Sequence, residues 1–168
     1  MSDYCQLARK ALSHWLSFHQ KLRPSPDKYP PAACFVSIHR PNGDLRGCMG
    51  TLEPTYKNVA EEIVQNAISA GTRDPRFSPV KPEELNHLRF DVSILRAPEI
   101  IPDMSFLDVN NYGVIVSHGS RRGVLLPGLE GIDSPEKQVE IAKRKAGIAP
   151  GEAIQLQRFE VEWHHEAR

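Results

Sequence analysis

The chain has 168 residues and a mass of 18.9 kDa, which suits one domain or two small lobes that share a core. Hydrophobic residues make up 40% and charged residues 25%, so the composition is that of a globular protein and excludes a disordered chain. The 21 basic residues balance the 21 acidic residues. A net charge of zero argues against broad, charge-driven binding to nucleic acid or to an anionic membrane.

The cysteine pattern indicates the compartment. Cys5, Cys34 and Cys48 are an odd number without a CxxC pair, so they are typical of neither a disulfide framework nor a zinc ribbon. Charges and histidines interrupt the apolar residues of segment 1–21, and no apolar run approaches the ~20 residues that span a membrane. We therefore expect a cytoplasmic protein with free thiols, no signal peptide and no membrane segment.

Apolar spacing and turn residues predict helices and a hairpin in the first half of the chain. Residues 4–18 carry one apolar stripe, which predicts an amphipathic helix with Ser2 or Asp3 as its N-cap. Four prolines make residues 23–31 an extended connector. The further predicted elements are strands over 33–39 and 45–52 around an Asn42-Gly43 turn, a helix over 55–70, an irregular segment over 71–82 and a short helix over 83–88.

The second half predicts mainly strands. Ser134 followed by Pro135 starts a helix that runs to Ala146, and Gly147 is its C-cap. The other predicted elements are a strand over 88–96, a loop over 97–111, a hairpin of 113–117 and 123–126, and a final strand over 153–163 with a bulge near Arg158. Hairpins and non-alternating helices together predict an α+β fold.

The segment Arg46-Gly47-Cys48-Met49-Gly50 is the first candidate site. On a regular strand Arg46 and Cys48 share a face, where the guanidinium would lower the pKa of the thiol. Backbone amides at Gly47 and Gly50 could receive an anion. The alternative interpretation is a glycine-kinked strand with a buried, unreactive cysteine.

A second candidate follows the helix over 55–70. Asp74 lies between Arg73 and Arg76 in a loop that Pro75 restrains. Asp74 could orient Arg46 or Arg76 and leave a guanidinium fork for a carboxylate or phosphate. The alternative is a purely structural ion pair that fixes a long loop.

His118, at the tip of the second hairpin, is a possible acid or base, and the alternative is an ordinary solvated turn. His14 and His19 lie five residues apart on one helix, and His164 and His165 point to opposite faces of a strand. The sequence contains no HExxH, EF-hand, Walker or GxSxG motif. We therefore predict no metal and no cofactor.

The stretches CFVSIHRPNGDLRGCMGTLEP, AISAGTRDPRFSPVKPEEL and GVIVSHGSRRGVLLPGLEGIDSPEKQVEIAKRKAGI resemble the AMMECR domain family, protein A of the AmmeMemoRadiSam system. The resemblance covers about residues 4–165, Met49 replaces the usual isoleucine, and LLPGLEG resembles the bacterial branch. It implies one AMMECR-type domain over 1–168 with two unequal, intertwined lobes. The implied fold is α+β, with a barrel-like mixed or antiparallel sheet and peripheral helices.

The resemblance also implies a functional cleft at LRGCMG but no settled activity. The ligand-binding candidates are Arg46, Gly47, Met49, Gly50, Asp74 and Arg76. The partners that it implies are a radical-SAM enzyme and a Memo-like protein.

Three functions follow as hypotheses. The first is a component that binds an unidentified small molecule, peptide or partner protein. The second is a thiol-dependent enzyme with Cys48 as nucleophile and His118 as base. The third is RNA binding or a role in RNA modification, which the zero net charge disfavours.

Overall fold

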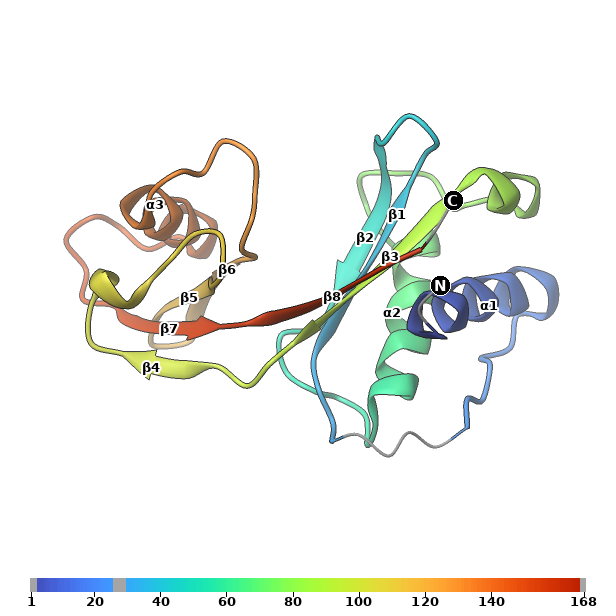
Figure 1. Ribbon diagram of the computed structural model, residues 1–168, viewed down its shortest axis with the longest axis horizontal. Coiled ribbons are helices and arrows are strands. Elements are labelled where there is room, and N and C mark those ends of the chain that lie inside the picture. Colours follow the sequence, from blue (N-terminus) through green and yellow to red (C-terminus); the bar gives the residue numbers. More distant parts are fainter. Residues whose placement is uncertain (1–2, 26–29, 167–168) are drawn as a thin grey trace. The chain divides into compact units, whose positions relative to one another are not determined.

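The computed structural model describes residues 3–25 and 30–166 (Figure 1). The chain forms two compact units. Unit 1 comprises the residues up to Leu95 together with those from Glu162 onward, and unit 2 comprises Arg96–Val161. The elements of unit 1 are α1 Asp3–Phe18, β1 Cys34–His39, β2 Leu45–Gly50, α2 Val59–Thr72, the 3-10 helix η1 Pro82–His87, β3 Arg89–Leu95 and β8 Val161–His165. Those of unit 2 are β4 Glu99–Ile101, the 3-10 helix η2 Met104–Phe106, β5 Gly113–His118, β6 Arg121–Leu125, α3 Pro135–Ala146 and β7 Gln155–Phe159.

The strands form two four-stranded sheets, which confirms the α+β class. The strand order is β2-β1-β3-β8 in sheet A and β4-β7-β5-β6 in sheet B, and the pairs β1–β2, β1–β3, β4–β7, β5–β7 and β5–β6 are antiparallel. Each sheet ends in two edge strands, so the strands of the described chain close no barrel, and the predicted barrel-like sheet is wrong. The predicted strand 153–163 is divided between the two sheets, because β7 belongs to sheet B and β8 belongs to sheet A.

Unit 1 has its core between sheet A and two helices. Val36 and Ile38 alternate with the less buried Ser37 and His39 along β1, so one face of the sheet points into the core. The apolar stripe predicted for α1 packs there through Ala8 and Leu12, and α2 packs beside it through Ile63 and Ala67. Figure 1 shows both helices next to β1–β3. The opposite face of sheet A, to which Ser37 and His39 point, is called the helix-free face below.

Unit 2 has a smaller core in which α3 packs on sheet B. Val139 and Ala142 of α3 join Val114, Val116 and Leu156 of the strands. The helix begins as predicted, because the Ser134 side chain accepts a hydrogen bond from the Lys137 amide. It ends at Gly147, which adopts a left-handed conformation at φ 71°.

Three predicted elements differ from the structure. The second helix begins at Val59, because the buried Glu62 carboxylate accepts the amides of Thr55 and Tyr56 and holds them outside the helix. The predicted loop 97–111 contains the short strand β4 and the 3-10 helix η2. The final strand is interrupted at Glu160, and β7 and β8 lie on either side of that interruption.

The remaining predicted elements are confirmed, with small shifts at their ends. The short helix over 83–88 is the 3-10 helix η1, which begins at Pro82. The N-cap candidate Ser2 and most of the proline-rich connector lie outside the described residues. No helix in the described ranges is both long enough and apolar enough to cross a membrane.

Candidate functional site

The LRGCMG segment is strand β2, which lies at the edge of sheet A. Ser37 pairs with Cys48 and Ile38 with Gly47, but His39 pairs with Leu45. The shift leaves Arg46 as an extra residue, which is a β-bulge. The segment is therefore not the regular strand on which the sequence argument placed Arg46 and Cys48 on one face.

The two glycines of the motif are required by close packing. An ideal Cβ atom at Gly47 would lie 2.1 Å from the carbonyl oxygen of Ala70 in α2. At Gly50 it would lie 2.3 Å from Cδ1 of the Phe35 ring on β1. The close approach of the Ala70 backbone at Gly47 and of the Phe35 ring at Gly50 explains why both positions are glycine. Met49 pairs with Val36 and packs against the core of unit 1.

Arg46 is buried and its guanidinium is bound within unit 1. Nε and Nη2 donate to the two carboxylate oxygens of Glu84 at 3.0 and 3.1 Å. Nη1 and Nη2 also donate to the carbonyls of Ser78 and Pro79 at 2.9 and 3.3 Å. These bonds fix the loop between α2 and η1, and the ion pair holds the pKa of Glu84 below its ordinary value. These bonds use four of the five N–H groups of the guanidinium, and the ligand-binding role of Arg46 stays a prediction.

Asp74 and Arg76 form the second part of the site. Asp74 is buried, and its carboxylate accepts hydrogen bonds from Nε and Nη2 of Arg76 at 3.0 and 2.8 Å. It also accepts the amide of Arg76 at 3.0 Å. These bonds hold the pKa of Asp74 well below its ordinary value and raise that of Arg76. Of the two partners predicted for Asp74, the structure shows Arg76.

Asp74 joins the two sequence motifs, because its Oδ2 accepts the backbone amide of Cys48 at 3.0 Å. The carboxylate therefore pairs an amide at the edge of sheet A that would otherwise point to solvent. The Arg76 side chain remains 58% exposed. The Asp74–Arg76 pair, Cys48 and Ser37 are called the Cys48 site below.

The thiol of Cys48 is half-buried on the helix-free face. Its Sγ lies 3.2 Å from the hydroxyl oxygen of Ser37. Burial raises the pKa of the thiol, and the Ser37 hydrogen bond and the Arg76 charge oppose that shift only in part. The sequence argument expected a lowered pKa caused by Arg46, and the structure shows the opposite direction and a different neighbouring arginine. The raised pKa disfavours the thiolate.

His118 lies in unit 2, at the end of β5. Its Nδ1 lies 2.5 Å from the carbonyl oxygen of Ala153, and its Nε2 lies 3.9 Å from Glu152. Glu152 is also paired with Arg121. The described residues hold no cluster of His, Cys, Asp and Glu side chains suited to a metal ion.

Sequence reasoning missed polar residues on the helix-free face. Ser37 pairs across the strands with Asp91, which is buried. His39 and His165 place their Nδ1 atoms 3.5 and 3.3 Å from the Asp91 carboxylate, and burial lowers the pKa of His39. An acidic residue between the apolar Phe90 and Val92 was the available signal, because strand alternation places it on the face opposite the core.

Comparison with known proteins identifies relatives along nearly the whole chain. The profile of the AMMECR1 family matches residues 5–164. A protein of Thermotoga maritima is 52% identical over 132 residues, which cover 78% of this chain and 76% of that protein. A Clostridium acetobutylicum protein is 42% identical over 170 residues, which cover 98% of this chain but only 36% of that longer protein.

Archaeal proteins show the same similarity. A protein of Methanothermobacter thermautotrophicus is 36% identical over 179 residues, which cover 96% of this chain and 91% of that protein. The crystal structure of the uncharacterized protein PH0010 from Pyrococcus horikoshii superposes with a TM-score of 0.85 at 31% identity. The superposed residues cover 95% of this chain and 88% of the PH0010 chain. Relatives therefore occur in both bacteria and archaea, and the predicted bacterial branch stays a prediction.

Proposed function

The chain belongs to the AMMECR1 family, and on that premise we propose that it is a binding component whose Cys48 site captures an anionic group of a ligand or partner protein. The observation that carries this proposal is that the Arg76 guanidinium is both held by an ion pair and exposed. Buried Asp74 holds it in place, yet the side chain is 58% exposed. Its Nη1 group makes no hydrogen bond to any described residue, so it can donate to a carboxylate or phosphate.

The site is better suited to binding than to nucleophilic catalysis. Burial raises the pKa of Cys48, whereas a catalytic thiol needs a large thiolate fraction. The remaining side chains of the site, Ser37, Asp74 and Arg76, are held by hydrogen bonds in a fixed arrangement. Such a preorganised surface loses little entropy when it binds.

The resemblance to protein A of the AmmeMemoRadiSam system supplies the partner classes of the proposal. They are a radical-SAM enzyme and a Memo-like protein encoded in the same genome. The proposal includes a cytosolic location, which the free cysteines support. An acidic segment on either partner would fit the charge of Arg76.

The decisive experiment compares two arginine variants of the same loop. Arg76→Gln removes the oriented guanidinium, and Arg73→Gln removes an equal charge from an exposed neighbour. Binding of each purified partner is measured for both variants and for the wild type. We expect Arg76→Gln to weaken the affinity about tenfold and Arg73→Gln to leave it nearly unchanged.

A small-ligand arm uses inorganic phosphate and citrate as probes. If the site captures a free anion, either probe raises the unfolding temperature of the wild type and of Arg73→Gln but not of Arg76→Gln. The proposal fails if neither partner and neither probe binds. It also fails if Arg76→Gln binds as the wild type does.

A further inference from the structure

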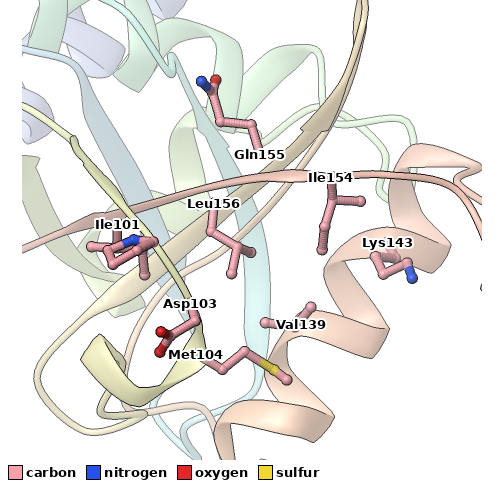
Figure 2. A pocket seen from close by; sticks show the side chains of 9 residues that line it. Ile101, Asp103, Met104, Val139, Lys143, Ile154, Gln155 and Leu156 are labelled. Carbon is pink, nitrogen blue, oxygen red and sulfur yellow. The ribbon is translucent and has the colours of Figure 1, made fainter.

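Unit 2 contains a partly open cavity of about 630 Å³ that none of the hypotheses above uses. Its lining combines residues of β4, η2, α3 and the start of β7 (Figure 2). The apolar lining residues are Ile101, Pro102, Met104, Val139, Ile154 and Leu156. The volume falls within the range of roughly 300–1,000 Å³ that is typical of small-molecule sites.

The walls of the cavity are well ordered by the fold. Ile101 and Leu156 pair with each other across β4 and β7, and both are at least nine-tenths buried. Val139 is equally buried and belongs to α3, whose two ends are capped. Figure 2 shows Leu156, Ile154 and Met104 around the same space. On these sides the cavity is thus lined by apolar side chains that the fold holds in place.

Two charged residues line the cavity, and only one of them is engaged. The Asp103 carboxylate accepts the amide and the hydroxyl of Ser105 at the start of η2. Lys143, which is half-buried in the last turn of α3, has no ion pair or side-chain hydrogen bond within the described chain.

The two neighbouring cations differ from Lys143 in this respect. Arg144 pairs with Glu140, and Lys145 donates to the carbonyl oxygen of Val124. Of these three consecutive basic residues, Lys143 is therefore the one that lines the cavity and has no partner among the described residues. An unpaired cation at such a wall is complementary to an anion attached to an apolar body.

We propose that this cavity binds a small organic acid, with its apolar body against Ile101, Val139 and Leu156 and its carboxylate at Lys143. This inference is independent of the proposed function, because every residue that it uses belongs to unit 2. The Asp103 carboxylate also lines the cavity, so the charge of the ligand belongs on the Lys143 side, and its apolar chain or ring must be one that the volume can hold.

The test uses the three methionines of the chain as reporters. Met104 lines the cavity, whereas Met49 packs in the core of unit 1. The full chain, labelled at the methionine methyl groups, is titrated with octanoate and separately with uncharged octanol. We expect octanoate to shift the Met104 signal saturably and to leave Met49 unchanged, with octanol binding more weakly.

Two substitutions separate the charge from the apolar contact. Lys143→Gln should weaken octanoate binding about three- to tenfold without changing octanol binding. Arg144→Gln is the matched control, because it removes the same charge from an adjacent residue that does not line the cavity, and it should bind octanoate as the wild type does. Ile154→Trp fills the cavity and should abolish the shift for both compounds.

Three results would overturn the inference. The first is an unshifted Met104 signal in folded wild-type protein at high octanoate concentration. The second is equal affinity for octanol and octanoate. The third is a Lys143→Gln variant that binds octanoate like the wild type.

Discussion

The backbone amide of Cys48 donates a hydrogen bond to the Asp74 carboxylate across 3.0 Å. The two positions are 26 residues apart in the chain, and this one bond unites the LRGCMG segment and the Asp74–Arg76 loop in a single site. The same carboxylate orients the Arg76 guanidinium. Asp74 therefore determines the position of both groups on which the proposed function depends.

Replacing Asp74 should destabilise unit 1 and release Arg76. In Asp74→Asn the charged acceptor of the Cys48 amide and the Arg76 side chain is lost, and we expect the free energy of unfolding to fall by about 1–3 kcal/mol. Urea unfolding measures the change. Asp44→Asn is a suitable control, because Asp44 is exposed in the turn between β1 and β2 and should change stability by less than about 0.5 kcal/mol.

The contribution of Asp74 to stability should also depend on pH. Its folded-state pKa lies below the ordinary value of 3.8, so its stabilising effect is fully present above that value. The effect is lost as the pH falls below 3.8 toward the folded-state pKa. The difference in unfolding free energy between wild type and Asp74→Asn should therefore be constant near pH 7 and shrink in acid. A difference that grows in acid would contradict the assignment.

Alkylation of Cys48 should show a protonated thiol at neutral pH. Cys5 and Cys34 are fully buried, and burial raises the pKa of Cys34 to about 12, so Cys48 is the thiol that reacts in the folded protein. We expect its rate to rise with pH through an apparent pKa above the ordinary 9.0. Arg76→Gln should raise that pKa further, because the guanidinium favours the thiolate. An apparent pKa well below 9.0 would instead support the thiol-dependent enzyme.

A methyl group at Gly47 should strongly destabilise the protein. In Gly47→Ala the Cβ atom would lie 2.1 Å from the Ala70 carbonyl oxygen, so β2 and α2 must separate. We expect a loss of about 2–4 kcal/mol in the free energy of unfolding. Gly151→Ala is the control, because its Cβ atom would meet nothing within 4 Å. Equal stability of the two variants would show that the close approach is unimportant.

Arg46 and Glu84 should act as one structural unit. Arg46→Gln leaves the carbonyls of Ser78 and Pro79 without their donors, and we expect a loss of about 2–4 kcal/mol. In a double-mutant cycle with Glu84→Gln, measured by urea unfolding, the coupling energy should exceed about 1 kcal/mol. Independent, additive effects would mean that the two side chains do not depend on each other.

The sequence by itself determined most of the helices and strands. The apolar period of residues 4–18, the Asn42-Gly43 turn and the Ser134–Gly147 caps are local signals, because each depends on neighbours within one or two turns of chain. The two site motifs were also visible in the sequence, since glycine and proline at such positions restrict the backbone. Their proximity, however, is a tertiary contact between the Cys48 amide and Asp74, which the spacing of the residues does not predict.

Only the tertiary structure decided which groups pair. Asp74 binds Arg76 while Arg46 binds Glu84, and the bulge at Arg46 depends on its register with β1. The direction of the Cys48 pKa follows from burial, which the order of residues does not encode locally. Long-range packing also determines three features that no local signal predicts: the strand β4, the interruption at Glu160 and the lack of a partner for Lys143. Long-range packing selects one partner from several that the sequence allows, and that selection sets the chemistry of each site.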